Sequence, residues 1–232
     1  MDRYIKKYIE DHIDLIDEND FNSLYNSCPE NLRGLLSESL YNCGIDPLSY
    51  LTSVPRRMWF ESESLEQFKI PAGIKSIEAS AFEDSTIEEV FIPASVVTIH
   101  TAAFCGCKQL KTITFESGSS LKLIGSSCFE NCSSIESIDL PEHLILIFND
   151  SFTNCSSLKS IKIPESVNKI GDYAFSHTDL STVTLPSNIA DIGKAIFFGC
   201  SSLKDIYIDQ EKPGPGWRPI NSGTNANLHW RK

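Results

Sequence analysis

The sequence predicts an α/β repeat solenoid: short coils stacked into a curved body, with an all-helical cap at the N-terminal end. Three observations lead to this prediction. A pattern of aliphatic residues, prolines and phenylalanines returns every 22 to 25 residues. No repeat can cover its own apolar face, so neighbouring repeats must stack. An amphipathic helical pattern precedes the first repeat, and with 41% hydrophobic residues among 232 the chain can bury a core.

The first half of each repeat predicts a short strand that a proline ends. Ile161 and Ile163 alternate with polar neighbours and so share an inward face, and Pro164 then removes a hydrogen-bond donor. The repeat begins with an aliphatic residue at Leu65, Ile87, Leu110, Ile135, Leu158, Leu180 and Leu203. The residue before the proline position is Ile70, Ile92, Phe115, Leu140, Ile163, Leu185 or Ile208.

The second half of each repeat predicts a turn back toward the core. An aliphatic step such as Val167 to Ile170 reverses the chain, and an aromatic residue then enters the interior. The aromatic position holds Phe82, Phe104, Phe129, Phe152, Phe175 and Phe197, and three residues later come Ser85, Cys107, Cys132, Cys155, Thr178 and Cys200. We therefore expect a solenoid over 54–208, made of a half-unit, six full units and a partial seventh, with a C-terminal capping segment over 209–232.

The region 1–53 predicts the helical cap. Ile5, Ile9, Ile13 and Ile16 lie on one stripe, which favours an amphipathic helix over 2–17. Capping residues and leucine spacing favour further helices over 20–25 and 29–43, with Gly44 as the stop of the latter, and Asp46-Pro47 favours a last one over 46–54. Such a cap would cover the open end of the solenoid.

These repeats resemble the BspA-like leucine-rich repeat family, whose units read much like SLKSIKIPESVNKIGDYAF at 157–175. Trp217 and His229-Trp230 are similar to the family's closing segment. The resemblance implies a curved scaffold whose strand-lined face binds other proteins, with no catalytic residues. The opening IDENDFNSLYNSC, followed by GIDPLSYL, looks like intracellular or bacteriophage-encoded relatives with a helical cap. For such a relative the resemblance implies a protein that binds and blocks a host or defence protein.

The net charge disfavours some classes of partner, and the cysteines and the N-terminal residues indicate a cellular compartment. The formal net charge of −11 argues against nucleic acid or an anionic membrane surface as a partner, since both favour a basic face. The N-terminal residues lack the apolar core of a secretion signal, and no stretch is apolar enough to span a membrane. We therefore expect eight free thiols and a cytoplasmic location, in the host cytoplasm if the chain is phage-encoded.

The sequence contains no recognisable catalytic, phosphate-binding or metal-binding motif, so we expect no catalytic residue, cofactor or metal. Cys107, Cys132 and Cys155 share one column of successive coils, which leaves two interpretations open. The sulfur atoms could form a metal or redox site, or the cysteines could be small buried residues that close the turn. Because Ser85 and Thr178 fill the same column, the second interpretation is favoured.

One stretch predicts a partner surface. LILIF at 144–148 is apolar at both inward and outward positions, and Leu123 adjoins it one coil earlier. The predicted contact residues are Leu123, Ile145, Leu146 and Phe148, with Phe91 and Tyr207 as single outward aromatics on the first strands. Exposed apolar clusters usually contact another molecule. The alternatives are that the N-terminal helices cover this patch or that a shift of register buries it.

These observations favour a non-catalytic protein-protein interaction scaffold of unknown partner and oligomeric state. The alternative is a structural or adhesive component of a virion or cell surface. An enzyme with an unrecognised site in the cap is disfavoured, because about 60 residues there offer no paired carboxylates near a histidine.

Overall fold

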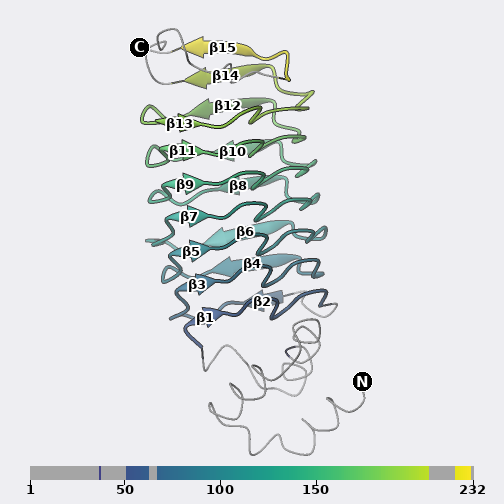
Figure 1. Cartoon of the computed structure of the whole chain (residues 1–232), viewed down its shortest axis with the longest axis vertical. Coiled ribbons are helices and arrows are strands. Elements are labelled where there is room, and N and C mark those ends of the chain that lie inside the picture. The colour runs from purple at the N-terminus through teal and green to yellow at the C-terminus, as the bar shows by residue number, and fades with distance from the viewer. Residues whose placement is uncertain (1–36, 38–50, 63–66, 209–222, 231–232) are drawn as a thin grey trace, which may run out of the picture.

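The computed structural model describes residues 37, 51–62, 67–208 and 223–230, and over these ranges the chain forms a β-solenoid (Figure 1). Coils of the predicted length stack along the longest axis of the molecule. Each complete coil contains two short strands, and each strand pairs in parallel with the equivalent strand of the next coil. The repeat therefore predicts the architecture of this region correctly.

The second strands of the coils form one continuous seven-stranded sheet in the order β1-β3-β5-β7-β9-β11-β13. Each has two residues, of which one points outward and the second, in most coils, is buried. The strands are β1 (Ser53–Val54), β3 (Ser76–Ile77), β5 (Thr98–Ile99), β7 (Leu123–Ile124), β9 (Leu146–Ile147), β11 (Lys169–Ile170) and β13 (Asp191–Ile192).

The first strands of the coils form three smaller parallel sheets on another side of the same core. In β12, exposed and buried residues alternate and Pro186 follows directly, as the pattern predicts. The strands are β2 (Gln67–Lys69), β4 (Glu89–Ile92), β6 (Thr112–Phe115), β8 (Ser137–Asp139), β10 (Ser160–Lys162), β12 (Thr182–Leu185), β14 (Asp205–Ile208) and β15 (Asn227–Trp230).

A column of stacked aromatic rings runs through the core. Phe82, Phe104, Phe129, Phe152, Phe175 and Phe197 are fully buried, and successive ring centroids lie 4.9 to 5.8 Å apart with the planes within 18° of parallel. Trp59 occupies the equivalent position of the first coil and is also buried. Each ring stacks on the rings of the coil before and the coil after it, so the aromatic stacking links neighbouring coils.

The turn that carries each phenylalanine contains two residues with positive φ, four positions apart. One column comprises Arg57, Ser80, Ala102, Ser127, Asp150, Tyr173 and Ala195, and the other comprises Glu61, Asp84, Gly106, Asn131, Asn154, His177 and Gly199. These left-handed residues turn the backbone so that its N–H groups still bond to the next coil. The Phe104 N–H, for example, donates to the Cys128 carbonyl at 2.9 Å.

The predicted α/β class is wrong for the described ranges 51–62, 67–208 and 223–230, which contain strands and turns and no helix. The all-helical cap is not supported. Its proposed helices over 2–17, 20–25 and 29–43 lie outside the described residues, apart from residue 37. The proposed helix over 46–54 is wrong at its end, because Ser53–Val54 forms β1 and pairs with β3. There the burial of Val54 outweighs the local helical pattern.

The C-terminal capping prediction is described only over 223–230, and the rest of 209–232 lies outside the described residues. Here β15 adds one more parallel strand beside β14. The His229 Nε2 lies 2.7 Å from Asp205 Oδ1, and the His229 ring stacks on Tyr207 with centroids 4.8 Å apart. The side chains of the two outermost strands therefore support one another.

Candidate functional site

The outward side of the seven-stranded sheet, here called the seven-strand face, carries a cluster of apolar side chains at its centre. Leu123 on β7 pairs in register with Leu146 on β9, and Ile145 and Phe148 flank β9 directly. Val97, which precedes β5, lies in the same column as Ile145. These five residues, Val97, Leu123, Ile145, Leu146 and Phe148, are called the apolar patch.

The members of the apolar patch all retain contact with solvent. Val97 is 39% exposed, and the other four are half-buried. The inward neighbours Ile99, Ile124 and Ile147 are completely buried. The strand alternation thus places the predicted residues on the outward side, with the backbone of a regular sheet beneath them.

The sequence interpretation did not include Val97 in this cluster. Alignment of the repeats could have identified Val97 as a member, because it stands at the same repeat position as Ile145. Its neighbour Thr98 is polar, however, and the single apolar residue of that coil was therefore not conspicuous.

Charged side chains border the apolar patch, and some of them have no counter-ion among the described residues. Lys75 and Lys122 are exposed in the column of Val97, and neither pairs with a carboxylate in the described part of the chain. The Lys122 ammonium donates instead to the His143 carbonyl at 3.5 Å. At the C-terminal edge, Lys169 Nζ lies 2.7 Å from Asp191 Oδ2.

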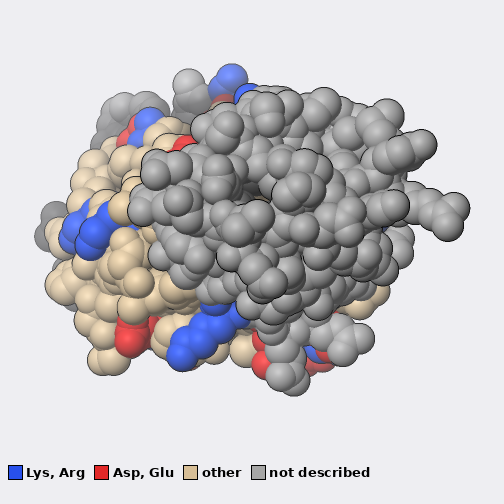
Figure 2. Space-filling model, turned by 90° about the horizontal axis from the view of Figure 1, so that it is seen from below, with Lys and Arg blue, Asp and Glu red and all other residues tan. Residues whose placement is uncertain are grey.

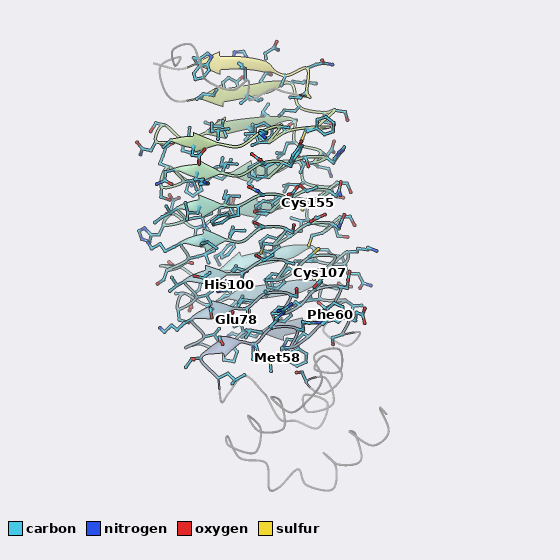
Figure 3. The ribbon with its side chains drawn as sticks, viewed as in Figure 1. Met58, Phe60, Glu78, His100, Cys107 and Cys155 are labelled. Atoms are coloured by element: carbon cyan, nitrogen blue, oxygen red, sulfur yellow. The ribbon has the colours of Figure 1, made fainter. Side chains whose placement is uncertain are left out.

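At the N-terminal edge of the same face, His100 Nε2 lies 3.8 Å from Glu78 Oε2. Ser76 Oγ also donates to Glu78 Oε1 at 2.6 Å. Figure 3 shows Glu78 and His100 together on one side of the stack. Seen along the stack, blue and red charged side chains project from the described part of the molecule at several places (Figure 2). On the seven-strand face, polar and charged side chains such as Lys122, Lys169 and His100 border the apolar patch.

Phe91 and Tyr207, the two other predicted contact residues, do not join the apolar patch. They lie on β4 and β14, which belong to the first-strand sheets. Both are half-buried. Lys69 Nζ lies 5.3 Å from the centroid of the Phe91 ring, and Tyr207 stacks on His229. The six predicted residues therefore belong to two separate surfaces.

A second exposed aromatic group lies on the turns near the C-terminal end of the stack. Tyr173 and Phe198 are 41% and 45% exposed, with ring centroids 6.4 Å apart in an edge-to-face arrangement. The His177 ring also packs edge-to-face against Phe198, with the centroids 5.5 Å apart. The repeat pattern does not reveal this group, because its members occupy different turn positions in successive coils.

The cysteine column is a set of hydrogen-bond donors inside the stack. Each thiol donates to the phenylalanine carbonyl of the preceding coil, at 3.0 to 3.1 Å: Cys107 to Phe82, Cys132 to Phe104, Cys155 to Phe129 and Cys200 to Phe175. Figure 3 shows Cys107 and Cys155 on the same side of the stack. In the same column, the Thr178 hydroxyl donates to the Phe175 carbonyl of its own coil at 3.0 Å, and Ser85 Oγ lies 3.5 Å from Cys107 Sγ.

Burial keeps the thiols of five of the described cysteines protonated. Burial raises the pKa of Cys128, Cys132, Cys155 and Cys200. For Cys105, burial and the nearby carboxylates of Glu130, Glu83 and Asp84 raise the pKa to about 12. Reactive and metal-binding cysteines need the thiolate form. Among the described residues, no group of three or more histidine, cysteine or acidic side chains is placed to hold a metal ion.

The geometry defines a class of protein: a β-solenoid of short repeats with an ordered aromatic core and an apolar patch on its longest sheet. The family model for the BspA type leucine rich repeat region matches six copies, over residues 5–104 and 75–204. The chain belongs to this family. Family members typically serve as protein-interaction or surface-adhesion scaffolds, and they are generally non-catalytic.

Solved structures of bacterial leucine-rich repeat proteins are similar to this chain. One, from Bacteroides ovatus ATCC 8483, has 22% identity and a TM-score of 0.56, and the match covers 75% of this chain and 52% of that one. A leucine rich cell surface protein from Faecalibacterium prausnitzii A2-165 has 25% identity and a TM-score of 0.48, covering 64% and 47% of the two chains. The chain thus spans about half the length of these two proteins, and the first supports the fold.

A comparison with curated proteins found no match. In the described part of the chain, no helix has the length and apolar character needed to cross a membrane.

Proposed function

We propose that this protein is a non-catalytic protein-binding scaffold and that the apolar patch is its docking surface. The observation that carries the proposal is the position of Leu123, Ile145, Leu146 and Phe148 on the outward side of a regular sheet. A soluble domain gains nothing in folding from apolar side chains that remain in water, so such a cluster usually serves an interface. The sheet beneath it is held by the buried core, which presents the patch with little loss of conformational freedom on binding.

Two finer aspects of the proposal concern origin and location. A cytoplasmic location stays a prediction, which rests on the resemblance of the opening segment to intracellular relatives. The phage-encoded inhibitor of a host or defence protein also stays a prediction, which rests on the resemblance of the opening segment; the similar structures described above come from bacteria. The competing function is adhesion at a cell or virion surface, and fractionation of the native cells separates the two: a membrane or particle fraction would favour adhesion.

The docking proposal is tested by affinity capture with matched variants. Leu146→Asp/Phe148→Asp places two charges in the apolar patch, where a partner would have to desolvate them. Thr182→Asp/Thr184→Asp places two charges at exposed positions of β12, away from the patch. We expect a protein that is retained by the wild type and by the β12 variant but lost by the patch variant, with all three equally folded by circular dichroism. Equal retention by the patch variant would contradict the proposal.

A further inference from the structure

We propose that the apolar patch binds an amphipathic α-helix of a partner protein, that acidic side chains border the apolar stripe of this helix, and that the helix lies along the stack. This inference rests on the proposed function, since it gives the chemical character of the partner that the same patch would bind. Two observations carry it: the charges that the seven-strand face leaves unpaired, and the spacing of the side chains in its columns.

The charges of the seven-strand face lie in three columns: the residue before each strand, the first residue of each strand and the residue after each strand. Both carboxylates in these columns already have partners. Asp191 pairs with Lys169 at 2.7 Å, and Glu78 accepts a hydrogen bond from Ser76 and lies 3.8 Å from His100. The remaining charged residues are Lys75 and Lys122, which have no counter-ion among the described residues. The face therefore has an excess of positive charge, although the whole chain has a formal net charge of −11.

The two unpaired lysines stand in the same column as two members of the apolar patch. In coil order this column reads Lys75, Val97, Lys122 and Ile145. Cationic and apolar side chains thus alternate along it. The Lys122 ammonium reaches only the His143 carbonyl, at 3.5 Å, and a carboxylate would replace that contact with a stronger, charge-assisted bond. A partner therefore complements this surface best with carboxylates beside apolar side chains.

The spacing along this column favours a helix over an extended strand as the partner segment. Each strand of the face has only two residues, so the long dimension of the face runs along the stack (Figure 1). Members of one column recur about every 4.8 Å, whereas a helix presents one side chain per turn of about 5.4 Å on a given face. Over the three intervals from Lys75 to Ile145, these spacings diverge by about 2 Å in total. A strand presents a side chain on one face about every 6.7 Å and would diverge by about 6 Å.

A helix in this orientation contacts two columns at once. Successive turns place a carboxylate at Lys75, an apolar side chain at Val97, a second carboxylate at Lys122 and a second apolar side chain at Ile145. The neighbouring stripe of the helix, three or four residues away in sequence, packs on Leu123 and Leu146. The anchors of the partner therefore have the spacing by which amphipathic helices bind apolar surfaces.

The test uses the full chain and two synthetic peptides of about 20 residues, long enough to form a helix in water. Both peptides carry leucines along one face; one has glutamates on both sides of the leucines, and the other has lysines at the same positions. Fluorescence anisotropy measures the dissociation constants. We expect the wild type to bind the glutamate peptide at least about tenfold more tightly than the lysine peptide. The negative net charge of the chain alone would give the opposite preference.

Charge reversal at the two lysines provides the matched variant. Lys75→Glu/Lys122→Glu should reverse the preference and bind the lysine peptide more tightly. Lys162→Glu/Lys204→Glu changes the net charge equally on the side of the first-strand sheets and should bind both peptides like the wild type. Circular dichroism checks that all variants are equally folded.

Three results would each overturn the inference: no binding of the glutamate peptide by the wild type, equal affinity for the two peptides, or an unchanged preference in Lys75→Glu/Lys122→Glu. These results are distinct from failure of the proposed function. A protein captured by the wild type, lost by Leu146→Asp/Phe148→Asp but retained by Lys75→Glu/Lys122→Glu would overturn only the acidic helix as the partner, and docking through the apolar patch would stand.

Discussion

At the scale of single residues, a side chain at a positive-φ position of the turns raises the energy of the backbone. Some of these positions hold residue types that do not tolerate this conformation well. Asn131 and Asn154 suit positive φ, because their short polar side chains tolerate it, but Ala102, Tyr173 and Ala195 do not. These residues are held there by the stacking of the coils on either side. The turns therefore store backbone strain that a single substitution can release.

We expect Ala102→Gly to raise the free energy of unfolding by about 0.5 to 1 kcal/mol, because glycine adopts φ near +55° without the steric cost that a Cβ atom incurs. The matched control is Ala103→Gly, at a buried neighbour without positive φ, which should lower the free energy of unfolding instead. Urea unfolding of both variants measures the difference. A loss of stability in Ala102→Gly would mean that the turn is not strained at this position.

The cysteine column also makes a prediction for single residues. Cys132→Ser retains a donor for the Phe104 carbonyl and should be close to the wild type in stability. Cys132→Ala removes the donor and leaves a small cavity, and should lower the free energy of unfolding by about 1 to 2 kcal/mol. The carbonyl keeps its bond from the Cys107 N–H, which limits the loss. Urea unfolding distinguishes the variants; equal stabilities would show that the thiol serves only as filler.

The dependence of stability on alkaline pH tests the buried thiols of the cysteine column without a mutation. Burial raises the pKa of Cys132 and Cys155 above the ordinary thiol value of 9.0, so the folded chain keeps these protons longer than the unfolded chain does. Below about pH 9 these thiols therefore do not lower the free energy of unfolding. Above that pH, the free energy of unfolding falls by about 1.4 kcal/mol per pH unit for each buried thiol. Unfolding free energies measured from pH 8 to 10.5 should show this fall. The Cys132→Ser/Cys155→Ser variant should show a shallower slope; an unchanged slope would assign the fall to other groups.

At the scale of whole elements, the aromatic column joins the coils. Phe129→Ala in the middle of the column should lower the free energy of unfolding by about 3 to 5 kcal/mol, since it opens a cavity between two close-packed rings. Phe129→Leu fills most of that space and should cost clearly less.

Because each coil contacts only its neighbours, the damage from Phe129→Ala should be local. Hydrogen exchange should accelerate mainly in the coils that contain Phe104, Phe129 and Phe152, while β14 and β15 retain their protection. Uniform acceleration along the whole stack would contradict the nearest-neighbour description.

The elements that the sequence predicts well are those whose signal repeats. The phenylalanine column, the strand-ending prolines and the alternation in strands such as β12 are visible because six copies reinforce one another. The first column of residues with positive φ carries no such signal, since Ser80, Ala102 and Tyr173 occupy one structural position with unrelated side chains. The helix predicted over 46–54 failed at Ser53–Val54 for a related reason: pairing with β3 is a long-range contact that a local helical pattern does not contain.

In the candidate site, too, the sequence predicts what a repeated local pattern determines and does not predict what depends on contacts between distant residues. Leu123, Ile145 and Leu146 are predictable as outward residues because strand alternation fixes their side of the sheet. That Phe91 and Tyr207 lie on another surface depends on how each coil is folded back on itself. The hydrogen bonds of the cysteine column depend on the spacing between coils, and only the structure supplies that spacing.

At the scale of the whole molecule, a rigid stack presents two different surfaces. The seven-strand face has an apolar centre, and the first-strand sheets carry the hydroxyls of Thr112, Thr114, Thr182 and Thr184.

If the apolar patch is a docking surface, a bound partner must shield its side chains, and oxidative footprinting measures that shielding. The purified chain at high dilution and the same chain in extract of its native cells are exposed to hydroxyl radicals, and modification is measured by mass spectrometry. We expect protection of Leu123, Ile145, Leu146 and Phe148 in the extract, while Tyr173 and Phe198 on the turns stay reactive. Equal modification of the apolar patch under both conditions would contradict docking through it.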